Sequence, residues 1–180
     1  GRNLAFRDMI TEDLGRSGDS PPETTPEQVY RQVREYTDRY PDKAVVAWHN
    51  GVTAMPALMA GAAQVLNRNP SAGHGQGRSI DRTPVDVFVQ DRLAADLARM
   101  TPANDLVAAG QKAWALADPE RRTVLIYAYD GPTVTLAPVL AGRAGQWFNP
   151  RDGRAVALAQ AGEVLTKPDA GGWALLLRPA

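Results

Sequence analysis

The N-terminal part of the chain, up to Met100, contains apolar runs of strand length separated by stretches with helical periodicity. Ala44–Trp48 is continuously apolar, which is typical of a strand covered on both faces in a parallel sheet. Leu4–Thr11 and Ala62–Leu66 are two further runs of strand length. Because strand and helix signals alternate, we expect an α/β arrangement in which Ala44–Trp48 and Ala62–Leu66 pair in parallel.

Helix signals lie between and after these runs. Thr25 is a good N-cap with proline at the next position, and an apolar stripe predicts a helix that ends near Tyr40. A short helix fits Thr53–Gly61. A longer helix begins at Pro84 and keeps apolar residues at helical spacing as far as Met100.

The pattern changes after Asn104 to short apolar or alternating runs, separated by turn signals rich in Asp, Asn, Gly and Pro. Such a series predicts an all-β fold, either a small antiparallel β-sandwich or a barrel. We therefore expect two parts, residues 1–104 and residues 105–180. The expected strands are Lys112–Ala117, Thr123–Tyr129, Thr133–Ala137, Ala144–Phe148, Arg154–Leu158, Glu163–Thr166 and Trp173–Leu177.

Composition limits the functions that the chain can have. Among its 180 residues, 20 basic and 20 acidic side chains balance, so charge gives no argument for nucleic acid or an anionic membrane as a partner. No apolar stretch approaches the roughly 20 residues that a membrane helix needs, and no basic-then-apolar leader opens the chain. The absence of cysteine excludes disulfides, thiolate metal sites and a cysteine nucleophile, and it leaves the compartment open. The two histidines lack metal-binding spacing and no dinucleotide fingerprint is present, so we expect neither a metal nor a cofactor.

Several stretches resemble one family of enzymes. Gln146–Gly153 (QWFNPRDG) and Gly172–Leu177 (GWALLL) resemble the β-domain, named after collagen binding, that closes apiosidase-like (β/α)8 glycoside hydrolases. Arg99–Val107 looks like the joint between barrel and β-domain, Tyr40–Val46 is similar to barrel strand 7, and Leu58–Ala63 is similar to the entry into strand 8. The resemblance implies the last strands and helices of a TIM-type barrel followed by a β-sandwich, in a glycosidase acting on plant or microbial polysaccharide.

The chain departs from this family in two ways. A complete barrel needs about 250 residues, so the resemblance implies that the rest of the barrel lies upstream or in a partner chain. The family usually has a catalytic carboxylate at the end of strand 7, and the matching position near His49 has no acid. Three explanations stay open: the register of the comparison is shifted, Glu12 serves from the preceding strand, or this member has lost the standard mechanism.

Candidate site residues follow the predicted α/β strands, because the carboxyl ends of barrel strands carry the chemistry. Neighbouring residues of a strand point oppositely, so Glu12 and Asp13 cannot form the carboxylate pair of a glycosidase. Each candidate also has a purely structural explanation. The two acids could cap a loop, Trp48 could pack under a loop, and Gly73–Arg78 could be a flexible loop at the mouth of the site. As catalytic candidates we take Glu12 and His49, and as substrate-binding candidates Asp13, Trp48, Asn50, His74 and Arg78.

The all-β part offers a non-enzymatic alternative, in which the chain is a carbohydrate- or matrix-binding module. Trp147 and Trp173 lie inside apolar runs, however, where we expect core positions rather than a sugar platform. Asn149–Gly153 is expected to be a hairpin turn. A third hypothesis is a proteolytic product that is stable only beside its N-terminal partner. Because a few barrel strands expose an open edge, we expect a partner chain or association through residues 1–100.

Overall fold

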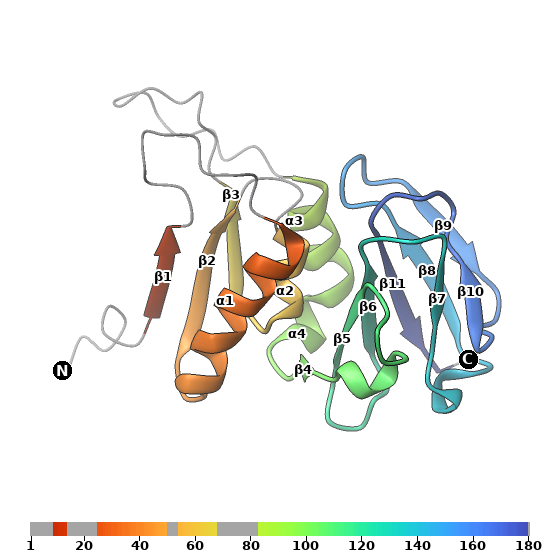
Figure 1. The fold of residues 1–180 in the computed structure, drawn as a ribbon, viewed down its shortest axis with the longest axis horizontal. Coiled ribbons are helices and arrows are strands. Elements are labelled where there is room, and N and C mark those ends of the chain that lie inside the picture. Colours follow the sequence, from red (N-terminus) through yellow and green to blue (C-terminus); the bar gives the residue numbers. More distant parts are fainter. Residues whose placement is uncertain (1–8, 14–24, 50–53, 68–82, 180) are drawn as a thin grey trace. The chain divides into compact units, whose positions relative to one another are not determined.

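The structure is a computed structural model that describes residues 9–13, 25–49, 54–67 and 83–179 (Figure 1). The chain forms two compact units, Gly1–Val87 and Phe88–Ala180, which we call the α/β unit and the β unit. The units divide within a helical segment, whereas the change from helices to antiparallel strands comes at Thr101. The domain boundary between residues 104 and 105 stays a prediction.

The α/β unit contains a parallel sheet of three strands in the order β1 (Met9–Asp13), β2 (Ala44–His49) and β3 (Gln64–Asn67). β2 and β3 pair in parallel, with Trp48 opposite Leu66, which confirms the predicted pairing. The helices α1 (Pro26–Arg39) and α2 (Ala54–Met59) lie in the two connections (Figure 1). Three parallel strands are not a barrel, and no barrel is shown by the described residues.

Local chemistry explains where α1 begins and which face it buries. The Thr25 backbone N–H donates to Gln28 Oε1 (2.8 Å) and the Gln28 N–H donates to Thr25 Oγ1 (3.3 Å), which forms a capping box. Val29 and Val33 are fully buried in one apolar cluster with Val45 of β2. The predicted helix is thus confirmed, together with the reason for its position.

The predicted helix from Pro84 is also present, although it is not a regular α-helix throughout. It consists of α3 (Pro84–Phe88), a π-helical segment η3 (Val89–Leu93) and α4 (Ala94–Leu97). None of the helices in the described ranges is long and apolar enough to span a membrane.

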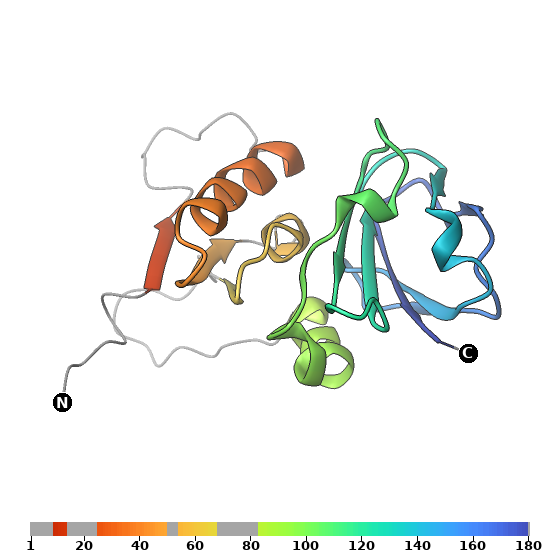
Figure 2. The ribbon, with the colours of Figure 1, turned by 90° about the horizontal axis from the view of Figure 1, so that it is seen from below.

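The β unit has a six-stranded antiparallel sheet in the order β4-β5-β6-β11-β8-β9 and a two-stranded sheet of β7 and β10. Figure 2 shows the smaller sheet over one face of the larger one, an arrangement consistent with a β-sandwich. All seven predicted strands are formed, and only the short β4 was not predicted. The strands are β4 (Thr101–Pro102), β5 (Ala113–Ala117), β6 (Val124–Ala128), β7 (Thr133–Thr135), β8 (Ala144–Phe148), β9 (Ala155–Leu158), β10 (Val164–Thr166) and β11 (Trp173–Arg178).

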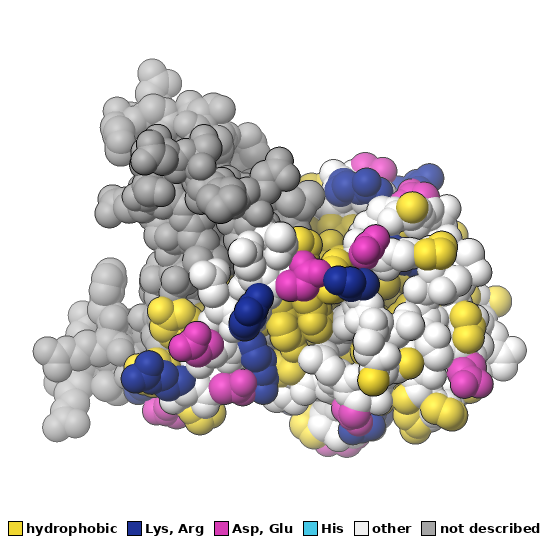
Figure 3. All heavy atoms as spheres, in the orientation of Figure 1, with side chains coloured by type: hydrophobic (Ala, Val, Ile, Leu, Met, Phe, Trp, Pro, Cys, Tyr) yellow, Lys and Arg dark blue, Asp and Glu magenta, His cyan; other side chains and the backbone are white. Residues whose placement is uncertain are grey.

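The core of the β unit lies between its two sheets. Trp147 is 3% exposed and Trp173 is fully buried, and both belong to the main apolar cluster, which confirms their predicted core positions. On the face of the β unit seen in Figure 3, uncharged side chains predominate.

Residues before Thr101 also pack in the β unit. Phe88 stacks on Phe148 with ring centroids 4.2 Å apart. Asp96 Oδ2 accepts hydrogen bonds from Thr123 Oγ1 (3.0 Å) and Arg178 Nη2 (3.2 Å). The segment from Phe88 to Leu97 therefore contacts β8, β11 and the residue that precedes β6.

Gly145 in β8 tests how closely the sheet is packed. A Cβ atom there would lie 2.7 Å from Leu176 O and 2.7 Å from Leu177 Cδ2. Since real Cβ atoms do not approach backbone oxygen so closely, we expect Gly145→Ala to destabilise the protein by about 1–3 kcal/mol in chemical denaturation. Gly162→Ala is the matched control, because its nearest neighbour would be Val164 O at 3.7 Å. Equal stability of the two variants would contradict the expectation.

Candidate functional site

Four of the seven predicted site residues lie at the carboxyl ends of β1 and β2. In the register of β1 and β2, Glu12 lies opposite Ala47 and Asp13 lies opposite Trp48. His49 is the last residue of β2 and lies opposite Asn67 of β3. Because the strands are parallel, the backbones of the four predicted residues in β1 and β2 reach the same edge of the sheet.

The other predicted residues, Asn50, His74 and Arg78, lie outside the described residues. Asn67 was not predicted as part of the site, since the predicted strand ended at Leu66. Its position at the end of β3, beside His49, adds an amide-bearing residue to this edge. The signal for it was present, because it follows an apolar run of strand length.

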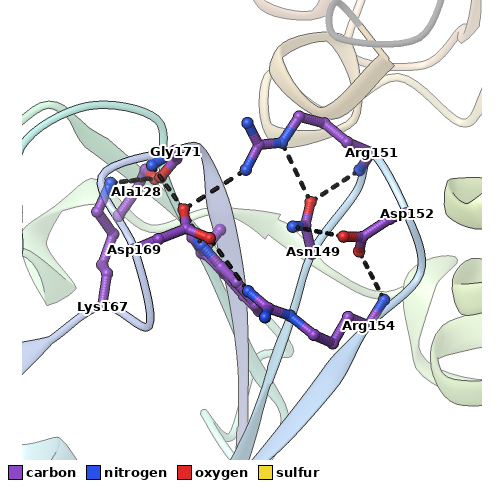
Figure 4. Close-up of polar contacts among 9 residues, drawn as sticks. Ala128, Asn149, Arg151, Asp152, Arg154, Lys167, Asp169 and Gly171 are labelled. Carbon is purple, nitrogen blue, oxygen red and sulfur yellow. Dashed lines mark hydrogen bonds and ion pairs between the residues drawn. The ribbon is translucent and has the colours of Figure 1, made fainter.

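A second cluster of polar residues lies in the β unit, where the β8–β9 hairpin meets the loop before β11 (Figure 4). Within the hairpin, the Arg151 N–H donates to Asn149 Oδ1 (3.0 Å) and the Arg154 N–H donates to Asp152 Oδ1 (2.8 Å). The Asn149 N–H donates to Arg154 O (2.8 Å), which closes the predicted hairpin turn. Gly153 adopts φ 77°, a conformation that glycine allows without a steric penalty.

Asp169 connects this hairpin to the loop and to the core. Its Oδ1 accepts hydrogen bonds from the indole N–H of Trp173 (2.8 Å) and the backbone N–H of Gly171 (2.8 Å). Arg151 Nη2 lies 3.4 Å from Oδ1, and Arg154 Nη2 lies 3.1 Å from Oδ2. The Arg154 guanidinium also lies over the Trp173 ring, 4.9 Å from its centroid. Each of the two stretches that carry the family resemblance in the sequence contributes to this network, Arg151 from the first and Trp173 from the second.

The buried Lys167 stabilises the same loop through hydrogen bonds to backbone carbonyl oxygens. The residue is 4% exposed, and its Nζ donates to Gly171 O (2.7 Å) and Ala128 O (3.3 Å). Its backbone N–H donates to Pro132 O (2.9 Å). Burial lowers the pKa of the Lys167 ammonium, against the opposing effect of Asp130 and Asp169. A lysine in a loop of Pro, Asp and Gly gives no sequence signal of burial, and this residue was missed.

This arrangement fits a structural role better than a chemical one. The carboxylate of Asp169 and the ammonium of Lys167 are engaged by groups of the protein itself. Burial raises the pKa of the nearby Tyr127 to about 12. Within the described ranges, no three His, Asp or Glu side chains are placed to hold a metal ion.

Acid should weaken this network. The hydrogen bonds from Trp173 and Gly171 hold the pKa of the Asp169 carboxyl below its ordinary value of 3.8. A depressed carboxyl pKa contributes stability above the unfolded-state value, and this contribution is lost as pH falls through the folded-state value. We expect the free energy of unfolding of Asp169→Asn to fall less than that of the wild type as the pH is lowered from neutral through 3.8 and below, where the folded-state carboxyl becomes protonated.

Denaturant titrations at each pH would measure this difference. Asp91→Asn is a suitable control, because it removes one exposed carboxylate from η3, far from the loop in sequence. If the free energy of unfolding changed with pH in the same way for the wild type and Asp169→Asn, the Asp169 carboxylate would not contribute to stability.

Comparison with known proteins does not assign the chain to a family. No family model matches the chain, and a search of curated proteins finds no significant match.

Proposed function

We propose that the chain is the C-terminal portion of a glycoside hydrolase acting on plant or microbial polysaccharide, with the α/β unit as part of a (β/α)8 barrel. The observation that carries the proposal is the register of the parallel sheet. It aligns Glu12 and Asp13 with the end of β2, where Trp48 and His49 lie. Acidic residues at the carboxyl ends of barrel strands are what sugar hydrolysis uses.

The residues have distinct roles in this proposal. Glu12 acts as the acid that protonates the glycosidic oxygen or as the base that activates water, and His49 assists it. Trp48 stacks on the apolar face of a sugar ring, while Asp13, Asn50, His74 and Arg78 contact hydroxyl groups. Glycosidases need a second carboxylate about 5–10 Å from the first, and this group would come from the rest of the barrel, upstream or in a partner chain.

The β unit is non-catalytic in this proposal. Its charged residues Asp169 and Lys167 form hydrogen bonds with other groups of the protein, which stabilise the loop before β11. Trp147 and Trp173 are buried, which argues against them as a sugar platform. The alternative of a non-enzymatic carbohydrate- or matrix-binding module would therefore have to use other residues.

The proposal is tested with the complete protein, including any residues that precede Gly1. Plant and microbial polysaccharides are incubated with it, and the release of reducing ends is measured beside binding in a pull-down with insoluble polysaccharide. Release of sugar from at least one polysaccharide supports the enzyme. Binding without release from any of them would favour the binding module instead.

A further inference from the structure

The strand β9 forms one edge of the six-stranded sheet, and among the described strands it pairs with β8 alone. Its residues Ala155 and Ala157 are exposed, and Val156 is 38% exposed although it lies opposite the buried Trp147. Leu158 is half-buried and packs against the core cluster. β9 is thus an apolar strand that its own sandwich covers only in part.

The hydrogen-bonding register identifies which backbone groups of β9 face outward. The Asn149 N–H donates to Arg154 O, so Arg154 directs its backbone toward β8. In an antiparallel ladder this direction alternates along the strand, so Val156 also faces β8 while Ala155 and Ala157 face the open side. No hydrogen bond within the described residues uses the outward N–H and C=O groups of these two alanines.

The two edges of the large sheet differ in how they are protected. Proteins usually protect an edge with a very short strand, a proline, a charge or a bulge. At the opposite edge, β4 is only two residues long and contains Pro102. β9 has none of these features in its four residues. Its open side is therefore available for pairing in a way that β4 is not.

We propose that β9 pairs antiparallel with β9 of a second copy of this chain, which joins two β units through one continuous sheet. A twofold axis at Val156 places Ala155 opposite Ala157 of the other copy, so the outward N–H and C=O groups of both residues find partners. The same pairing sets Arg154 opposite Leu158 of the other copy, so that like charges are not opposed. The formal net charge of zero leaves no overall repulsion between copies.

The test uses Ala157→Pro in the full chain. Proline removes the outward N–H at Ala157 but none of the bonds to β8, since proline is tolerated in edge strands on the open side. Sedimentation velocity over a concentration series should show a reversible dimer for the wild type. The loss of the edge hydrogen bonds should weaken the dimer of the variant by about tenfold or more.

Two further variants keep the test decisive. Ala155→Lys places a charge at the same edge without changing the backbone, and it should also yield monomers. Val164→Lys is the matched control, since Val164 is 60% exposed on β10 and its charge should leave the dimer intact. A wild-type chain that stays monomeric at all soluble concentrations, or a dimer that survives both β9 changes, would overturn the proposal.

Amide hydrogen exchange gives an independent measurement within one strand. The Val156 N–H should be protected at every concentration, because it faces β8. The Ala155 and Ala157 N–H groups should gain protection only as the concentration rises and the dimer forms. Protection of these two amides that does not depend on concentration would contradict pairing between copies.

Discussion

Glu12→Gln is expected to lower glycoside turnover by the complete protein by about a hundredfold or more, because a positioned acid or base contributes roughly 10²–10⁴ to such rates. Glutamine preserves the size and hydrogen-bonding capacity of the side chain but cannot transfer the proton. The melting temperature should stay unchanged. Steady-state kinetics on the polysaccharide that the wild type hydrolyses, with thermal melts of the same samples, would measure both effects.

Asp13→Asn provides the matched control for this variant, since it neutralises the adjoining acid of the same strand. A residue that only contacts substrate should raise KM more than it lowers kcat. If Glu12→Gln retained the wild-type kcat, the proton donor would have to come from another strand, and the role proposed for Glu12 would be wrong.

Trp173→Ala should destabilise the protein by about 3–5 kcal/mol, the usual cost of truncating a large buried aromatic side chain. Trp173 is fully buried at the start of the central strand β11. The change would also remove the indole N–H from Asp169 and the ring from beneath Arg154. Thermal melting followed by circular dichroism would detect the loss.

Trp173→Phe separates these contributions. It keeps most of the buried ring but has no N–H for Asp169, so its stability should lie between those of the wild type and Trp173→Ala. A phenylalanine variant as unstable as the alanine variant would mean that the hydrogen bond matters more than the packing. An alanine variant with the wild-type melting temperature would contradict the core position itself.

The sequence was most informative where structure depends on neighbours along the chain. The capping residue Thr25, the proline after it and the hairpin turn Asn149–Gly153 act within a few residues, and each was found where expected. The seven β-unit strands were likewise separated by turns with recognisable chemistry. Parallel pairing of β2 and β3 followed from the alternation of strand and helix.

Contacts between segments distant in the sequence were harder to predict. The network around Asp169 joins residues 15 to 18 positions apart, and no periodic pattern links them. Lys167 is buried against the usual preference of lysine, because two carbonyl oxygens converge on its ammonium. At the sheet edge of the α/β unit, the pattern predicted the strand ends to within two residues, but the position of Asn67 beside His49 depended on register.

The position of β11 has a consequence for synthesis of the protein. This strand follows all the other described strands in sequence, yet it lies between β6 and β8 in the sheet. While the chain emerges from the ribosome, β4 to β6 and β8 to β9 are therefore two separate pieces with unpaired inner edges. Long-range pairing of this kind forms slowly and leaves strand edges open to wrong partners. The nascent β unit must remain unfinished until residue 178 has left the exit tunnel, a period in which chaperones would bind it most readily.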